Sequence, residues 1–490
     1  MTPLSRLLSG RPRRGWGLLL LVPSLVFAQR RNTPADSMEN VVVRLFNQEK
    51  AGAIYQMLDR SFQSHYPREG FVNWLNREKQ SRGKIAGTKW SGQLEGWSVY
   101  QLDFQKDPAD TMSLLLAVQG NKISGLAIRP LNSFGPREQP VRDNNPLKNS
   151  IDSLVEKNIR PYIQQAGTVG VSIGIICGGK TYTYGYGETK KDNGQLPDDR
   201  TIFEIGSITK TFTASLLAAL VLEKRCRLND PVSKYLPDSL PPLQTGSIPV
   251  TLKMLANHTS GLPRVPSDLE AVTGASPSDP YARYDDNDLF RYLDTVRLRS
   301  VPGLRMQYSN LGFGLLGTVL EKISGLPYQK LLQEQICDQL KMGDTRTVLN
   351  SEQQKRFAQG NNGLGETGHW HFESLAGCGA IRSTVHDLLL YLQAHFKPGD
   401  ATLLTGAFRL CERPTFNLPG RKIGLAWMNP GGLPHIYWHN GGTGGFRTFC
   451  AYNPDQRVAV VVLANSTVST DKAGFALIRA FTRDPLVVNK

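Results

Sequence analysis

Apolar residues in the first part of the chain change their spacing once, and the change separates helices from strands. From Glu39 to Leu58 they recur every three or four positions, which predicts a helix, and Arg68 to Lys79 predicts a second. Further on they alternate with polar residues, a pattern typical of strands with one buried face. The alternating positions are Tyr100, Leu102 and Phe104, then Leu114, Leu116 and Val118, followed by the run Ile123 to Ile128. Helices followed by a meander of strands predict a small α+β domain over residues 36–130.

A linker and then a new hydrophobic pattern follow this first domain. Residues 131–146 contain three prolines and few apolar side chains, which predicts a linker. An amphipathic helix begins near Leu147, and the apolar run from Gly170 to Cys177 predicts a buried strand. A Gly-Gly turn leads into Thr181 to Tyr186, so these two segments predict a β-hairpin.

The pattern returns to strands only near the C-terminus. Between about residues 250 and 400 it is mostly helical, with long loops that contain Pro and Gly. The later predicted strands are Ile423 to Met428, Ile436 to Trp438, Phe446 to Tyr452 and Val458 to Ala464, with a closing helix through Phe475, Ile478 and Phe481. Because strands occur at both ends of residues 147–485, we predict a second α+β domain. Its antiparallel sheet has flanking helices and an inserted helical region.

The N-terminus has the three parts of a secretory signal. Four Arg form a charged region, Trp16 to Phe27 is apolar, and Val26-Phe27-Ala28 is a cleavage site with small residues. An uncleaved anchor is the alternative, but Pro23 and the short apolar core favour a signal peptide over residues 1–28. No later apolar run approaches the ~20 residues of a membrane span. We therefore expect a secreted or periplasmic protein.

Composition excludes several classes of function. The formal charge is +15, but Lys and Arg are scattered and no nucleic-acid motif accompanies them, which indicates a basic, solvated surface. The six Cys contain no C-x-x-C pair, and His369 and His371 have no third ligand at metal spacing, so we expect neither metal nor cofactor. The sequence indicates no oligomeric state and no disulfide pairing.

One short stretch carries candidate chemistry. Gly206 leads into Ser207, and an Ala- and Leu-rich helix follows. Lys210 lies three positions after Ser207, so both side chains share one helix face. A hydroxyl and an amine at that spacing suit a nucleophile and the group that takes its proton, while the helix N-terminus favours a developing oxyanion. Alone, Ser-x-x-Lys is common at ordinary helix ends.

Two further motifs accompany it in a fixed order. Tyr308-Ser309-Asn310 comes about a hundred residues later, and His439-Asn440-Gly441-Gly442 comes before the last strands. This set resembles the serine β-lactamase-related hydrolases over about residues 150 to 485. That group contains class C β-lactamases, penicillin-binding D-Ala-D-Ala carboxypeptidases, D-aminopeptidases and esterases. The first domain is similar to the nuclear-transport-factor-like cone-shaped domains in the order of its elements.

The resemblance implies a role for each residue of the first two motifs. Ser207 would attack a carbonyl and form an acyl-enzyme. Lys210 and Tyr308 would remove its proton, with Tyr308 as the phenolic general base. Asn310 would bind the substrate amide and orient Lys210. A Tyr in an apolar loop is otherwise usually a core residue, and His258 is expected to be a structural hydrogen-bonding residue.

The third motif departs from part of the family. By family position, His439, Asn440 and Gly441 would bind substrate, and the N–H groups of Ser207 and Gly442 would form the oxyanion hole. Class C β-lactamases carry Lys-Thr-Gly here. An imidazole holds a carboxylate less firmly than an ammonium group at pH 7, and Asn440 lacks the Thr hydroxyl. We therefore expect acyl transfer but inefficient β-lactam hydrolysis.

Together these features predict an exported serine hydrolase. Its substrate would be a small molecule or peptide, and D-amino-acid peptides of the peptidoglycan type fit the family. A small-ester esterase is the alternative within this class. A non-catalytic, penicillin-binding-like receptor is the alternative outside it, and the natural substrate stays open.

Overall fold

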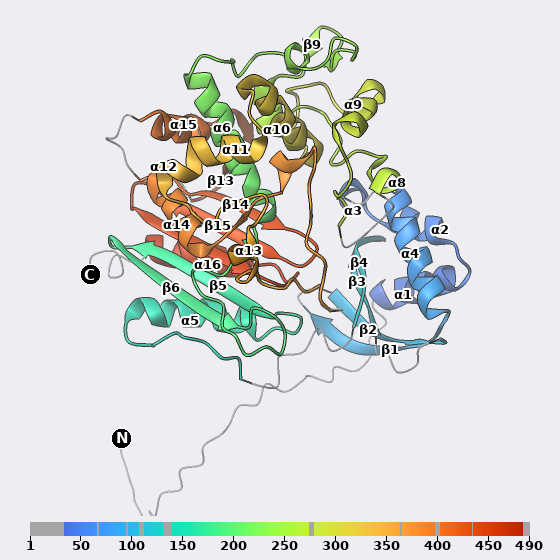
Figure 1. Cartoon of the computed structure of the whole chain (residues 1–490). Helices are drawn as coiled ribbons and strands as arrows, with labels where there is room; N and C mark the ends of the chain where they lie inside the picture. The colour runs from blue at the N-terminus through green and yellow to red at the C-terminus, as the bar shows by residue number, and fades with distance from the viewer. Residues whose placement is uncertain are drawn as a thin grey trace, which may run out of the picture. The chain divides into compact units, whose positions relative to one another are not determined.

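The computed structural model describes most of the chain after the predicted signal peptide (Figure 1). The described residues are 34–483 without 66–67, 95–96, 107–111, 131–139, 274–278, 363–364, 397–401 and 434. The predicted signal peptide and residues 131–139 of the predicted linker lie outside them. The chain divides into two compact units, Met1–Ile128 and Arg129–Lys490. None of the described helices is long and apolar enough to cross a membrane.

The first unit has four helices followed by a four-stranded sheet in the order β1-β2-β3-β4. Its elements are α1 (Pro34–Asn47), α2 (Ala51–Met57), α3 (Arg60–His65), α4 (Arg68–Arg82), β1 (Ile85–Leu94), β2 (Trp97–Phe104), β3 (Met112–Gln119) and β4 (Lys122–Pro130). Apolar side chains of the helices, such as Phe46 and Ile54, share one core with Leu102 and Leu116 of the strands. The single helix predicted for residues 39–58 is two helices, because Glu49 turns the backbone into the left-handed region (φ 60°).

The second unit contains one eight-stranded antiparallel sheet in the order β11-β12-β13-β14-β15-β16-β5-β6. Its strands are β5 (Gly170–Cys177), β6 (Lys180–Gly187), β11 (Phe416–Leu418), β12 (Arg421–Ile423), β13 (Met428–Pro430), β14 (Tyr437–Gly442), β15 (Arg447–Asn453) and β16 (Val458–Ala464). In Figure 1 the green strands β5 and β6 lie beside the orange-red C-terminal strands. Strands β5 and β16 are buried along their whole length, and both are interior strands of this order. The predicted sheet from both ends of the domain is confirmed.

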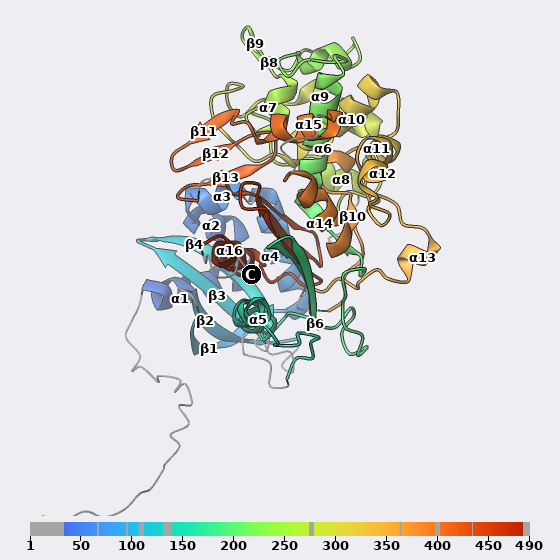
Figure 2. The same ribbon diagram turned by 90° about the vertical axis from the view of Figure 1, so that its left-hand side faces the viewer.

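Side chains alternate between the two faces of the sheet along its interior strands, and helices cover both faces. Val460 and Val462 pack toward α5 (Ser150–Ile163) and α16 (Asp471–Arg483), which lie together on one face (Figure 2). Val461 and Leu463 belong instead to the larger core on the other face. Helices α6 (Thr209–Leu222), α10 (Asn310–Ser324) and α14 (Val385–Ala394) contribute to that larger core. The candidate catalytic residues come from elements around this larger core.

The remaining elements form the predicted helical insertion and its connections. They are β7 (Phe203–Glu204), η2 (Gly206–Ile208), η3 (Val232–Tyr235), β8 (Gln244–Thr245), β9 (Ile248–Pro249), α7 (Leu252–Ala256), α8 (Leu269–Thr273), α9 (Asp286–Thr295), α11 (Tyr328–Leu332), η4 (Gln333–Cys337), α12 (Asp338–Leu340), α13 (Ser351–Gln354), η5 (Ala376–Cys378), β10 (Arg382–Ser383) and α15 (Leu403–Glu412). The strand predicted for Ile423 to Met428 is wrong. Ala426 has a left-handed backbone (φ 62°), which separates β12 from β13.

Candidate active site

Ser207 lies in a tight turn that is docked on the sheet. Gly206 has φ +51°, and a Cβ atom there would come within 2.6 Å of Gly442 N, so the position requires glycine. Just before it, the Ile205 carbonyl accepts a 2.9 Å hydrogen bond from Thr448 Oγ1 on β15. The sheet therefore fixes the turn from which Ser207 projects at the start of α6.

Lys210 is one turn farther along and is fully buried. Its Nζ lies 3.0 Å from Ser207 Oγ, 3.0 Å from Asn310 Oδ1 and 2.6 Å from the Cys378 carbonyl oxygen. An ammonium group has three N–H donors, so these three acceptors satisfy it completely. The structure thus brings together three residues that are distant in sequence around one amine.

The Asn310 amide is held by the first turn of α10. Ser309 caps this helix, because its Oγ accepts from Gly312 N at 2.8 Å and donates to Pro263 O at 2.6 Å. Asn310 Nδ2 then donates to the Tyr281 hydroxyl at 2.9 Å. Both ends of the Asn310 amide therefore have a partner, which fixes the oxygen toward Lys210.

Close packing between α10 and η5 positions the Cys378 carbonyl. A Cβ at Gly314 would come within 2.4 Å of Leu375 Cδ2, and one at Gly317 within 3.0 Å of the Gly377 Cα. Helix α6 holds the same segment from the other side, since Thr213 Oγ1 donates to Gly377 O at 2.7 Å. Small residues on α10 thus allow a main-chain oxygen to reach Lys210.

Tyr308 is half-buried and contacts the site through its ring. Lys210 Nζ is 5.0 Å and Arg264 Cζ is 5.1 Å from the ring centroid, and the His258 ring centre is 4.2 Å away. Its hydroxyl makes no hydrogen bond with another described residue. His258 Nδ1 accepts from Ser309 N at 3.1 Å, and burial holds the pKa of His258 well below its ordinary value. His258 therefore supports the Tyr308-Ser309 turn as a neutral, structural residue.

His439 and Gly441 lie on the face of β14 that meets the Ser207 turn. A Cβ at Gly441 would come within 2.0 Å of Ile205 O, so this approach also requires glycine. His439 is fully buried, and burial lowers its pKa to about 3. Its Nδ1–H donates to the Asn440 carbonyl at 2.7 Å, which leaves Nε2 as a buried acceptor without a protein partner. The imidazole is therefore neutral at pH 7.

Asn440 does not join this group. Its Nδ2 donates to Asp471 Oδ2 on α16 at 2.8 Å. Because side chains alternate along a strand, Asn440 projects from the face of β14 opposite to His439 and Gly441. The predicted substrate contact through the Asn440 side chain has no support in this arrangement. Gly442 N, in contrast, lies beside Gly206 and therefore near Ser207.

Sequence reasoning missed two groups that complete the site. The Cys378 carbonyl binds Lys210, but a main-chain oxygen has no residue type to recognise. The Tyr281 hydroxyl holds Asn310, but Tyr281 comes from a loop between α8 and α9 that has no hydrophobic period. The only signal was indirect, namely the small residues on either side of Cys378.

The two histidines that were weighed as metal ligands pair with different carboxyl groups. His369 lies beside Glu204, whereas His371 Nδ1 is 2.6 Å from Asp279 Oδ2. Across the described residues, no group of three or more His, Cys, Asp or Glu side chains has the arrangement that could hold a metal ion. All six cysteines are buried and free.

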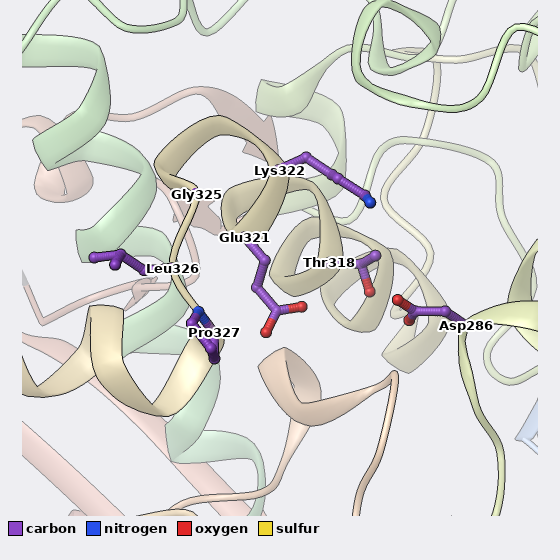
Figure 3. A pocket seen from close by; sticks show the side chains of 7 residues that line it. All are labelled: Asp286, Thr318, Glu321, Lys322, Gly325, Leu326 and Pro327. Atoms are coloured by element: carbon purple, nitrogen blue, oxygen red, sulfur yellow. The ribbon is translucent and has the colours of Figure 1, made fainter.

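A cavity of about 320 Å³ lies near the C-terminal end of α10, away from its Asn310 end (Figure 3). Asp286, Glu321 and Lys322 are its charged lining residues. Burial raises the pKa of both carboxyl groups. None of the predicted catalytic residues lines it, so this cavity is separate from the Ser207 site.

Sequence comparison identifies the family of the second unit. The sequence model of the Beta-lactamase family matches residues 155–482. The chain belongs to the beta-lactamase family. As a member of that family it is a serine hydrolase, and the match lies wholly within the second unit.

Individual relatives cover the same region. The chain is 32% identical over 325 residues to the D-alanyl-D-alanine-carboxypeptidase/endopeptidase AmpH of Escherichia coli (strain K12), covering 63% of this chain and 82% of AmpH. It is 27% identical over 354 residues to a Beta-lactamase of the same organism, covering 64% and 89%.

Solved structures show the same fold. A Beta-Lactamase/D-Alanine Carboxypeptidase from Pseudomonas syringae has a TM-score of 0.60 at 24% identity, covering 69% of this chain and 99% of that one. A class C beta-lactamase mutant has a TM-score of 0.59 at 25% identity, covering 67% and 97%. The predicted beta-lactamase-like α+β fold is therefore confirmed.

Proposed function

We propose that this member of the beta-lactamase family forms an acyl-enzyme through Ser207 on peptide or ester substrates. The observation that carries the proposal is the buried Lys210 amine, 3.0 Å from Ser207 Oγ and held by Asn310 and the Cys378 carbonyl. D-amino-acid peptides are the proposed substrate class, since AmpH is named as a D-alanyl-D-alanine-carboxypeptidase/endopeptidase. The predicted signal peptide supports action outside the cytoplasm.

The hydrogen bonds around Lys210 suit both of its protonation states. As an amine, its two N–H groups can donate to the Asn310 and Cys378 oxygens, which leaves the lone pair for the Ser207 hydroxyl. As an ammonium group, it donates to all three acceptors. Lys210 can therefore take the Ser207 proton without losing a partner, and no side chain has to move.

Each group of the site has one role in the proposed acylation step. Ser207 Oγ bonds to the substrate carbonyl carbon, and its proton passes to Lys210. Tyr308, whose hydroxyl is free of other described partners, delivers a proton to the leaving amine as the C–N bond breaks. The N–H groups of Ser207 and Gly442 stabilise the negative oxygen, and water later hydrolyses the ester.

The neutral state of His439 favours peptides and esters over β-lactams. In class C β-lactamases a lysine at this position supplies a cation for the substrate carboxylate, whereas here Nε2 is a buried, uncharged acceptor. This difference supports the expectation that β-lactams acylate Ser207 but are not turned over efficiently. A small-ester esterase is the second candidate, because ester acylation needs no such cation.

Intact-mass spectrometry of the purified protein tests the proposal. The protein without the predicted signal peptide is incubated with a fluorescent penicillin, an N-acyl-D-Ala-D-Ala peptide and a p-nitrophenyl ester. We expect a penicilloyl adduct and peptide cleavage with the native chain and with Ser215→Ala, also on α6, but neither with Ser207→Ala. Ester turnover without peptide cleavage would favour the esterase. No adduct and no turnover with any of the three would support the receptor alternative instead.

A further inference from the structure

A tight turn of the second unit presents an exposed leucine. In the turn Val301-Pro302-Gly303-Leu304, Leu304 N donates to Val301 O at 3.2 Å, and Gly303 has φ +80°. Pro at the second position and a Gly of positive φ at the third are typical of a type II turn. The Leu304 side chain is 64% exposed at the end of this turn. A single exposed leucine is ordinary, so its surroundings decide what it indicates.

Main-chain hydrogen bonds hold this turn in place. Gly303 N donates to Thr259 O at 2.8 Å, and Arg299 N donates to Gly261 O at 2.7 Å. Both acceptors belong to one short segment, so the turn is bonded to it at two points. Residues 297–305 thus form an anchored loop, the 297–305 loop, which holds the leucine at the surface.

The 297–305 loop carries positive charge only. No Asp or Glu occurs between Asp294 and Glu321, so the loop contains no acidic residue. Its cations are exposed, and none forms an ion pair with a described Asp or Glu; they are Arg297, Arg299 and Arg305. Other exposed cations of this unit, such as Lys234 and Lys355, pair with a carboxylate close by in the sequence. The leucine is therefore flanked by arginines that no described carboxylate neutralises.

The segment beside the loop continues the same charge pattern. Residues 239–267 include no Asp or Glu, and they contribute two cations, Lys253 and the exposed Arg264. A Cβ atom at Gly303 would come within 3.1 Å of Met254 Cε, so the helix that carries Lys253 packs against the turn. Folding thus joins two segments without acidic residues into one basic surface around the exposed leucine.

A basic surface with an apolar tip matches a membrane that contains anionic lipid. Arg and Lys near a bilayer are attracted to its negative surface, and an apolar side chain gains by entering the boundary between headgroups and acyl chains. We propose that the 297–305 loop is a docking surface for membranes rich in anionic phospholipid, with Leu304 inserted and the arginines on lipid phosphates. A dissolved anionic polymer would use the same cations but would give Leu304 no apolar partner.

This docking goes beyond the proposed function and does not depend on it. The predicted signal peptide supports it, because an exported chain meets the external face of the membrane that it crosses. Tyr308 follows shortly after the loop, and the residue between them, Gln307, donates its N–H to His258 O at 2.7 Å. Docking would therefore hold the proposed active site close to the membrane surface.

Co-sedimentation with lipid vesicles tests the docking surface. The protein without the predicted signal peptide is mixed with vesicles of phosphatidylcholine alone or with about one third phosphatidylglycerol. We expect binding only to the anionic vesicles, and added salt should weaken it. The double variant Arg299→Gln/Arg305→Gln should lower the partition coefficient about 10- to 30-fold, because each cation near the surface contributes about fivefold. Leu304→Ser should lower it about 5- to 10-fold but keep the salt dependence.

A matched control separates this surface from the overall charge. Lys330→Gln/Lys355→Gln also removes two exposed cations, which pair with Glu334 and Glu352, and should change binding by no more than about twofold. An equal loss in this control would overturn the inference, because it would show attraction to net charge alone. Absence of native binding to the anionic vesicles would overturn it as well.

The leucine variant distinguishes a membrane from a dissolved polymer. If the arginine variant loses binding but Leu304→Ser does not, the surface binds anionic groups without insertion, and the membrane assignment fails. The substituted side chains are exposed, so each variant should unfold at the native temperature in a thermal scan. Because the assay measures no hydrolysis, its failure leaves the Ser207 proposal standing, and a failure of Ser207 chemistry leaves the docking surface standing.

Discussion

Lys210 and His439, on the two walls of the proposed active site, differ in how completely their polar atoms are bonded to other described residues. On the helical wall, Lys210 has three acceptors, and Asn310 uses both its amide oxygen and its amide nitrogen. On the strand wall, His439 Nε2 and Thr443 Oγ1 are buried without a partner. Buried polar atoms normally have partners, so exceptions need a reason. The comparison indicates that the Lys210 amine is pre-organised for proton transfer, whereas the His439 ring leaves Nε2 open for substrate.

The largest effect on activity is expected from the substitution of Lys210 on the helical wall. Lys210→Met keeps most of the side-chain volume but removes the amine. We expect kcat/KM for a p-nitrophenyl ester to fall by about 10³-fold or more, since a positioned acid–base group contributes roughly 10²–10⁴. The Asn310 and Cys378 oxygens would lose a partner, which costs about 1–3 kcal/mol of unfolding free energy each.

A variant on the same helix separates loss of chemistry from loss of stability. Ser215→Ala removes a buried hydroxyl that bonds to Thr211 O and to the Tyr391 hydroxyl, and touches no proposed catalytic group. It should lower stability by about 1–3 kcal/mol in chemical denaturation but keep kcat within about threefold. Full ester hydrolysis by a folded Lys210→Met protein would contradict the assigned role of Lys210.

A pH-dependent effect is expected on the strand wall at His439. Burial lowers its folded-state pKa from 6.5 to about 3. As the pH falls below 6.5, the unfolded chain takes up a proton that the folded chain does not, so His439 lowers stability by about 1.4 kcal/mol per pH unit. His439→Gln lacks this titration and should lose about 2–3 kcal/mol less than the native protein between pH 6.5 and 4.5.

Denaturant unfolding curves at several pH values measure this difference. Above pH 6.5 the native and His439→Gln stabilities should run parallel, because the histidine is neutral in both the folded and unfolded states there. Parallel curves down to pH 4.5 would show that His439 is not buried as a neutral acceptor.

The smallest effect on activity is expected at Asn440, on the face of β14 opposite to His439. Asn440→Ala removes the hydrogen bond to Asp471, whose pKa is raised by burial. We expect a loss of about 1 kcal/mol in unfolding free energy and less than a twofold change in kcat/KM. Asn440→Asp, which sets two carboxyl groups against each other, should destabilise more. A large loss of activity in Asn440→Ala would show that the Asn440 side chain acts on the substrate after all.

The alternation of side chains along β14 explains why Asn440, a predicted substrate-binding residue, lies on the face away from His439. The strand predicted from the sequence ended at Trp438, so its period was not carried through Asn440. The structure continues β14 to Gly442, which places His439 and Gly441 on one face and Asn440 on the other. The family motif names three neighbouring residues, but a strand can present only alternate side chains to one site.

Local spacing in the sequence determined the core of the site. Ser207 and Lys210 share a helix face because three residues make almost one turn, and the apolar runs at both ends of the second domain predicted one sheet. Tyr308, Asn310 and His439 followed from motif order within the family. Tertiary structure decided that the Cys378 carbonyl binds Lys210 and that the Tyr281 hydroxyl holds Asn310, since both groups come from segments without a recognisable pattern. It also decided that His439 is neutral and that Arg264 is the exposed cation beside Tyr308, because burial and charge depend on neighbours that only folding brings together.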